Sequence, residues 1–218
     1  MSVYPRRSAQ FRTIAALVVL GTSSACTAGD EQAGSDSSAA ATASASDTGA
    51  AKDSMAGMNH GAMSNMTPMG GATGDPDRDF LRMMSDHHKG LIAMAHLTIE
   101  GQKKGSPGTQ ADADKLDMKQ DAELDSMVTK LEQQYKDPYN PAIMPDNQAM
   151  VDQLKTQSGA EYDRTFYQNV IKHHQQAIMM IDHSLPMLKD AQVKAMAERM
   201  KRDQTREIQE FERKASGS

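Results

Sequence analysis

Four stretches of the chain repeat apolar side chains at steps of three and four residues, the spacing of one face of an α-helix. The first stretch begins at Asp75, where a typical N-cap residue is followed by Pro76, and it continues to about Gln102. Its inner face consists of Phe80, Met84, His87, Leu91, Met94 and Thr98. The sequence therefore predicts a helix over about 75–102.

Three further long helices are predicted, over about 111–135, 159–184 and 189–214. The first of these has a rather polar inner face, formed by Leu116, Lys119, Gln120, Glu123, Leu124, Met127 and Leu131. The next has the inner face Phe166, Val170, His173, Ala177, Met180 and Ser184, and the last has Val193, Met196, Met200, Thr205, Glu207, Ile208 and Phe211. Residues 137–147 contain three prolines and predict a loop, followed by a short helix over 147–156.

The first and third long helices share a pattern that indicates an internal duplication. Phe80 and Phe166 each precede a doubled histidine by seven residues, and His87 and His173 are 86 positions apart. Each copy then consists of two long helices. The sequence predicts an all-α fold, a four-helix bundle over 75–215 built from two duplicated helical hairpins.

The first 25 residues have the pattern of an export signal. A basic start with Arg6, Arg7 and Arg12 precedes the short apolar run 14–20 and then small residues. Cys26, the single cysteine, follows directly and is a candidate for lipid attachment, although Ser23 stands where an aliphatic residue is usual. Ordinary cleavage before Cys26 is the alternative. An exported protein is expected, as a periplasmic or outer-surface lipoprotein anchored to the membrane through Cys26, or otherwise as a soluble secreted protein.

Two further segments precede the predicted bundle. Residues 26–54 are mostly Ala, Ser, Gly and Thr and predict a disordered tether, since nothing in them can form a core. Residues 55–74 predict a flexible segment rich in possible metal ligands, which are Met55, Met58, His60, Met63, Met66 and Met69. Methionine occurs 18 times in 218 residues, and in this segment core packing does not explain it.

The net charge excludes one large class of partners. The chain carries a net charge of −5, and the predicted signal holds three arginines and no acidic residue. The remaining chain is therefore more acidic still, which argues against nucleic acid as a partner. A homo-oligomer is compatible with a helical bundle of this kind.

The doubled histidines suggest metal binding. Successive helical residues point about 100° apart, so one of His87 and His88, and one of His173 and His174, is expected to face inward while the other faces a neighbouring helix or the bundle surface. Methionines share these helices at helical spacings, namely Met83, Met84, Met94 and Met180. Thioether and imidazole together favour copper as Cu(I), with Cu(II) or Ag(I) as alternatives.

A structural interpretation competes for several of these residue types. Methionine at helical spacing is often core filler, and this interpretation is preferred for Met118, Met127, Met196 and Met200. His96 and His183 are more typical of surface positions. The repeated pairs with similar flanks are harder to explain by packing alone.

The two histidine motifs also carry a family resemblance. HHKGLIAMA at 87–95 and HHQQAIMMI at 173–181 resemble the repeated HHxxAIxMA signature of the Domain of Unknown Function 305 family, as does GAEYDRTFY at 159–167. The resemblance covers about 76–214. Leu91 and Ile181 depart from the signature, whereas Met94 and Met180 keep it. It implies a ferritin-like four-helix bundle, usually exported and often a lipoprotein, with copper or silver bound by some members.

The sequence does not favour an enzyme. A di-iron site would need a glutamate three residues before a histidine, and none of the domain histidines has an acidic residue there. The leading hypothesis is an exported, non-enzymatic copper-binding protein for sequestration or homeostasis. The main alternative is a structural or interaction module whose histidines form buried hydrogen bonds, and a copper-directed redox enzyme is the weakest.

Overall fold

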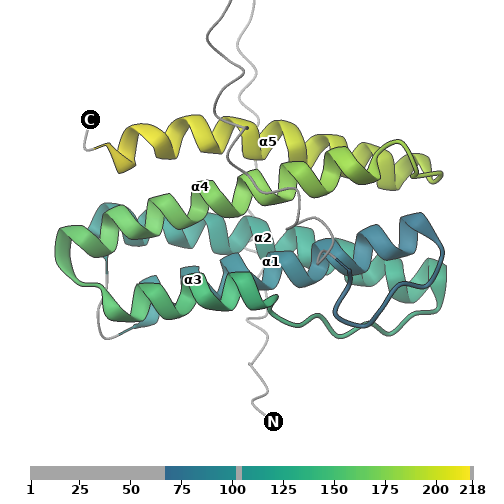
Figure 1. The fold of residues 1–218 in the computed structure, drawn as a ribbon, viewed down its shortest axis with the longest axis horizontal. Helices are drawn as coiled ribbons and strands as arrows, with labels where there is room; N and C mark the ends of the chain where they lie inside the picture. Colours follow the sequence, from purple (N-terminus) through teal and green to yellow (C-terminus); the bar gives the residue numbers. More distant parts are fainter. Residues whose placement is uncertain (1–66, 102–104, 217–218) are drawn as a thin grey trace, which may run out of the picture. The chain divides into compact units, whose positions relative to one another are not determined.

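The computed structural model describes residues 67–101 and 105–216, and these ranges contain five helices and no strand (Figure 1). The helices are α1 (Pro76–Glu100), α2 (Pro107–Tyr135), α3 (Pro145–Thr156), α4 (Gly159–Ser184) and α5 (Ala191–Ala215). The predicted all-α class is confirmed, and each predicted helix is present. None of the described helices is long and apolar enough to cross a membrane.

Capping side chains and prolines in the first turn set where α1, α2 and α3 begin. Asp75 accepts hydrogen bonds from the backbone of Asp77 and Arg78, as expected of an N-cap. α2 begins four residues earlier than predicted, since the Ser106 hydroxyl caps it and Pro107 occupies its first position. α3 begins two residues early at Pro145 for the same backbone reason.

The long helices form two hairpins. α1 packs mainly against α2, and α4 packs mainly against α5. The hairpins meet where α1 contacts α4, and α3 packs against both of these helices (Figure 1). Gly90 of α1 permits the approach of α3, because a Cβ atom there would lie 2.4 Å from the Cβ of Asn147.

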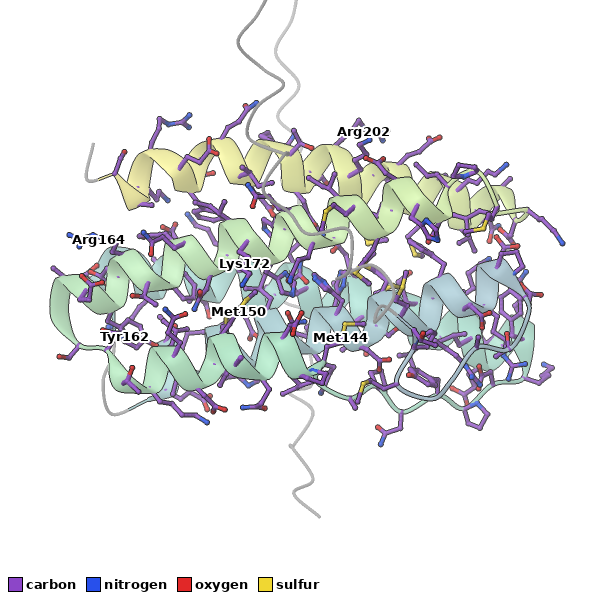
Figure 2. All side chains as sticks on the ribbon, viewed as in Figure 1. Met144, Met150, Tyr162, Arg164, Lys172 and Arg202 are labelled. Carbon is purple, nitrogen blue, oxygen red and sulfur yellow. The ribbon has the colours of Figure 1, made fainter. Side chains whose placement is uncertain are left out.

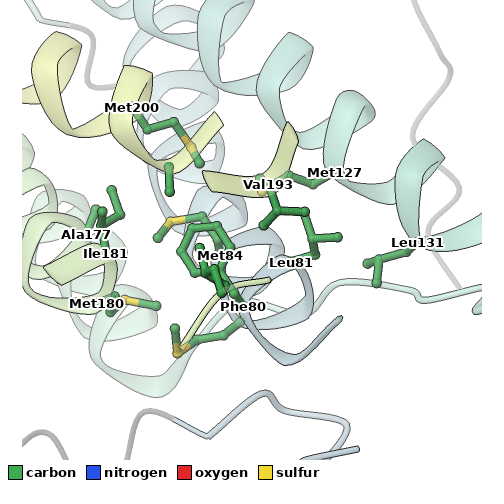
Figure 3. Close-up of a cluster of buried hydrophobic side chains, with 13 residues drawn as sticks. Phe80, Leu81, Met84, Met127, Leu131, Ala177, Met180, Ile181, Val193 and Met200 are labelled. Atoms are coloured by element: carbon green, nitrogen blue, oxygen red, sulfur yellow. The ribbon is translucent and has the colours of Figure 1, made fainter. Parts of the chain in front are cut away.

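Charged side chains extend from the outer faces of the helices, as Arg164 and Arg202 do in Figure 2. The buried apolar side chains form two separate clusters. The Phe80 cluster contains Phe80, Leu81, Met83, Met84, Met127, Leu131, Ala177, Met180, Ile181, Leu188, Val193, Ala197 and Met200 (Figure 3). The Phe166 cluster contains Leu91, Met94, Ala95, Ala113, Leu116, Met150, Val151, Leu154, Tyr162, Phe166, Tyr167, Val170 and Phe211. Each large side chain buried here contributes about 1.5–3 kcal/mol to folding.

The assignment of methionines to the core is correct with one exception. Met127 and Met200 are buried in the Phe80 cluster, and Met196 packs against it. Met118 is 68% exposed, so the prediction of a core position was wrong there. Its side chain lies on the outer face of α2, away from the inner positions Leu116 and Gln120, which are both buried.

Two equivalent aspartates tie the hairpins together. Asp77 of α1 accepts hydrogen bonds of 3.0–3.2 Å from the backbone of Lys189 and Asp190, directly before α5. Asp163 of α4 accepts a 2.8 Å bond from the backbone of Ser106, directly before α2. The two aspartates are 86 positions apart, which agrees with the predicted duplication.

Residues 67–74 are the described part of the segment that the sequence predicts to be flexible, and they lie against the helices. Asp86 accepts hydrogen bonds from the Met69 backbone at 2.9 Å, the Tyr139 hydroxyl at 2.6 Å and the Ala142 backbone at 2.9 Å. This buried carboxylate thereby joins the start of the described chain and the 137–144 loop to α1, next to His87.

Asp137 forms a second anchor for the loop. It follows the left-handed residue Lys136 that ends α2, and it accepts hydrogen bonds from Arg82 at 2.5 and 2.8 Å and from Arg78 at 2.8 Å. These bonds with Arg82 and Arg78 lower the pKa of Asp137 to about 2.

Replacement of Asp137 by asparagine should make the free energy of unfolding vary less with pH in the acidic range. Because the pKa of the folded carboxyl is depressed, its contribution is present above about pH 4 and is lost as the pH falls toward 2. We expect wild type to exceed Asp137→Asn in free energy of unfolding by about 2 kcal/mol at pH 6, with the gap closing near pH 2, in urea titrations. Asp152→Asn, which removes an exposed carboxylate, is the control and should change little; a gap that persists at pH 2 would contradict the assignment.

Candidate metal centre

The two doubled histidines meet at the contact of α1 and α4. The rings of His87 and His173 lie with centroids 3.7 Å apart at an interplanar angle of 35°. His88 points instead to α2, where its Nε2 lies 2.9 Å from Glu123, and His174 points to α5, where its Nε2 lies 2.9 Å from Glu207. The expected division within each pair is confirmed, with neighbouring helices rather than the surface as the outward direction.

These side chains form a polar layer between the two apolar clusters. On each of the four long helices, residues of one cluster precede the layer and residues of the other follow it. The polar layer consists of His87, His88, Gln120, Glu123, His173, His174, Gln204 and Glu207. Because Phe80 shares a cluster with Met180 while Phe166 shares the other with Met94, α1 and α4 run antiparallel past the histidines.

The ring nitrogens of the four histidines differ in their partners. His88 has both nitrogens 2.9 Å from oxygen acceptors, the Met84 carbonyl and Glu123. His173 has Nε2 2.9 Å from the His87 carbonyl, while its Nδ1 has no partner among the described residues. His87 has neither nitrogen bonded there, and His174 has a free Nδ1 and an Nε2 that contacts Glu207 without hydrogen-bond alignment.

Burial keeps the inner rings uncharged at neutral pH. The pKa values of His87 and His173 lie well below the ordinary value, first because burial disfavours the charged form and then because neighbouring histidines repel it. Burial also lowers the pKa of His174, against the opposing effect of Glu207. A neutral imidazole offers a lone pair, which is the state that binds metal ions.

Two glutamines and two glutamates of the layer went unrecognised as possible site residues in the sequence. Gln120 and Glu123 on α2 repeat as Gln204 and Glu207 on α5, with 84 positions between equivalents. This Gln-x-x-Glu repeat beside the histidine repeat was the available signal. Both glutamine side chains are fully buried, and neither amide has a hydrogen-bond partner in the described ranges.

The two halves of the layer differ in charge. Lys119 lies 2.6 Å from Glu207, and at the equivalent position of the other hairpin stands Asp203. Burial acts to raise the pKa of Glu207, but its contacts with His174 and Lys119 outweigh burial and the pKa lies below the ordinary value. The duplicated site is therefore chemically asymmetric.

The candidate methionine ligands are distributed over the two clusters. Met83, Met84 and Met180 belong to the Phe80 cluster, and Figure 3 shows Met84 and Met180 beside Phe80. Met94 belongs to the Phe166 cluster. Met94 lies seven residues after His87, and Met180 lies seven residues after His173, which corresponds to about 10 Å of helical rise in each case. Because α1 and α4 run antiparallel, these rises lead away from the histidines in opposite directions, and the structure does not bring Met94 and Met180 to one point. Their role as ligands stays a prediction.

The N-terminal candidates can be placed only in part. Met69 is described and is 52% exposed. Met55, Met58, His60, Met63, Met66 and Cys26 lie outside the described residues, as do the predicted signal and tether.

The remaining histidines of the described ranges lie outside the polar layer. His96 is partly exposed and lies 3.0 Å from Asp117, and His183 is exposed, as predicted for both. Within 67–101 and 105–216, no group of three or more His, Cys, Asp or Glu side chains is arranged to hold a metal ion. A metal in the polar layer would therefore use fewer such ligands, or add amide or thioether donors.

Comparison with protein families identifies the class. The model of the family described as Domain of unknown function (DUF305) matches residues 27–131 and 77–215, and the chain belongs to this family. The two overlapping matches together include both histidine motifs. A comparison with curated proteins found no match.

Among solved structures, the chain is similar to CopM. CopM in its Cu(II)-bound form is 26% identical, with a TM-score of 0.56 over 65% of this chain and 96% of CopM. CopM in its Cu(I)-bound form is 28% identical, with a TM-score of 0.54 over 63% of this chain and 93% of CopM. A DUF305 fragment from Deinococcus radiodurans, 23% identical over 66% of this chain and 97% of the fragment, has the same fold at a TM-score of 0.57.

The inner histidines should make the protein sensitive to mild acid. Because their pKa values are lowered in the folded state, unfolding takes up protons below about pH 6.5, and stability is lost as the pH falls. We expect metal-free wild type to lose about 1.4 kcal/mol of unfolding free energy per pH unit for each extra proton bound on unfolding. In the variant with His87→Gln and His173→Gln this slope should flatten, as measured by urea titrations between pH 7.5 and 5.5.

His96→Gln is the matched control. Its hydrogen bond with Asp117 raises the pKa of His96, so losing this ring should not weaken the sensitivity to acid. An unchanged slope in the variant of the inner pair would contradict the assignment of acid sensitivity to the polar layer.

Proposed function

We propose that this protein is an exported, non-enzymatic copper-binding protein that sequesters the metal or contributes to its homeostasis. The observation that carries the proposal is the meeting of four buried histidines, three of which have unpartnered ring nitrogens among the described residues. Similarity to CopM, which has been solved with Cu(I), Cu(II) and silver, supports copper as the metal.

His173 has the hydrogen-bonding pattern typical of a metal ligand. A ligating imidazole usually has one nitrogen oriented by a carbonyl or carboxylate while the other binds the metal. His173 contacts the His87 carbonyl and leaves Nδ1 free, and His174 contacts Glu207 and also leaves Nδ1 free. We therefore assign metal binding first to His173 and His174. We add His87, because both of its ring nitrogens are free among the described residues, and we give His88 a supporting role.

Copper in more than one oxidation state fits the donors. Imidazole and amide groups of the polar layer suit Cu(II), whereas thioethers suit Cu(I) and its mimic Ag(I). The Met/His-rich segment 55–74 supplies many thioethers, so we propose that Cu(I) is the main ion bound and that the protein also binds Cu(II). Storage of the ion requires no turnover, so we propose that the protein is not an enzyme.

The finer architecture and location belong to the same proposal. We propose that the four long helices form a ferritin-like four-helix bundle, with α3 added over α1 and α4. Export rests on the basic and apolar pattern of 1–25, and a lipid anchor on Cys26. A membrane-held protein outside the cytoplasm would meet incoming copper first.

A second function has two observations in its favour. His88 is fully satisfied by the Met84 carbonyl and Glu123, and the described residues hold no ready-made group of three His, Cys, Asp or Glu ligands. The polar layer would then serve a structural or interaction module, where buried hydrogen bonds specify how the helices pair.

Titration with Cu(I) against a competing chromophoric chelator distinguishes copper binding by the polar layer from a purely structural role. The full chain should lose at least one tightly bound equivalent when His87→Gln and His173→Gln are combined, because the inner rings supply the free nitrogens. His96→Gln, a change at a partly exposed histidine, should retain wild-type stoichiometry. Circular dichroism must show equal helicity in all three proteins. Equal binding by wild type and the double variant would favour the structural module.

A separate experiment tests the Met/His-rich segment. Replacing Met55, Met58, Met63, Met66 and Met69 together by leucine should lower the number of Cu(I) ions bound and leave helicity unchanged, because leucine keeps the apolar character and removes the thioether. The same chelator competition measures the stoichiometry. An unchanged value would remove this segment from the proposed function.

A further inference from the structure

A cavity of about 530 Å³ lies at the end of the Phe80 cluster, away from the polar layer. Its wall includes Thr67, Asp79, Met83, His183, Met187 and Lys189. The wall thus combines the start of the described chain, α1 and the end of α4. None of the four histidines of the doubled motifs lines this cavity.

Three residues of this wall carry soft or borderline metal donors. Met83 comes from α1 and is nearly buried, with 7% of its surface exposed. His183 lies in the last turn of α4 and has no hydrogen-bond or ion-pair partner among the described residues. Met187 lies one turn further on, where its backbone bonds to the Ser184 carbonyl, and it is 47% exposed.

The exposure of Met187 leaves its side chain accessible from solvent. A large apolar side chain gains free energy by burial, and few in the described ranges remain as exposed as this one. Two thioethers and an imidazole on the wall of one largely apolar cavity are a donor set that favours soft cations over hard ones. The charges of Asp79 and Lys189 on the same wall are opposite in sign.

We propose that Met83, His183 and Met187 form a binding site for a soft monovalent cation, Cu(I) or Ag(I), separate from the polar layer. His183 is ten helical residues beyond His173, which corresponds to about 15 Å of rise, so one ion cannot use both rings. The site extends the proposed function, on which it rests for the identity of the cargo. Thr67 and Pro68, the first described residues of the Met/His-rich segment, line the same cavity.

The test uses Cu(I) and Ag(I) with the full chain and three variants. The cavity variant combines Met83→Leu, His183→Gln and Met187→Leu, changes that keep volume and remove the donors. The layer variant combines His87→Gln and His173→Gln. Met118→Leu, which removes an exposed methionine far from the cavity wall, is the matched control. Stoichiometry is measured by chelator competition, and methionine methyl signals are followed by NMR with circular dichroism as the check on folding.

The proposal expects the cavity variant to bind one Cu(I) fewer than wild type, while Met118→Leu binds the same number. The methyl signals of Met83 and Met187 should shift on addition of Ag(I), in the layer variant as well as in wild type. His183→Gln alone should weaken binding at this site by about tenfold or more, since even changes outside the ligand shell cost that much.

Two results separate the cavity from the polar layer. Unchanged stoichiometry in the cavity variant, with methyl signals that do not respond to Ag(I), overturns the cavity site and leaves the layer proposal intact. Loss of one equivalent in the cavity variant and none in the layer variant supports the cavity site and instead overturns metal binding by the inner histidines.

Discussion

The burial of paired imidazoles between α1 and α4 is the constraint that organises this protein. The rings of His87 and His173 lie against each other in a plane that separates two apolar clusters. Buried polar groups cost free energy unless they find partners, so the layer restricts how the helices pair. A slip of one helical turn would move His87 or His173 toward an apolar cluster and bring an apolar residue, such as Met84 or Leu91 of α1, into the polar layer.

The duplication explains why this layer is nearly symmetric. Equivalent aspartates, Asp77 and Asp163, each fix the start of a helix in the other hairpin, and equivalent glutamates each contact an outer histidine. The symmetry fails at Lys119, which reaches Glu207 and has Asp203 as its counterpart. One half of the layer therefore receives a positive charge that the other lacks, so the two outer histidines are held in different electrostatic surroundings.

The chain belongs to the DUF305 family and is similar to CopM, and its described part contains buried imidazole and thioether groups. These donors form two groups that are separate in space. Imidazoles with amides and carboxylates occupy the middle of the helices, whereas Met83, His183 and Met187 lie around a cavity at one end. Such a separation would let one protein hold copper in different coordination environments.

The sequence by itself determined the all-α class, the helices, the duplication and the division of each histidine pair, because helical periodicity and turn residues are local properties of the chain. It did not identify Glu123, Glu207 or their neighbouring glutamines as partners, and it placed the exposed Met118 in the core. Only the tertiary structure decided that His87 meets His173 and that Met94 and Met180 lie in opposite clusters. The physical reason is that these contacts join residues about 86 positions apart, and the antiparallel packing of α1 and α4 that creates them leaves no trace in the spacing along either helix.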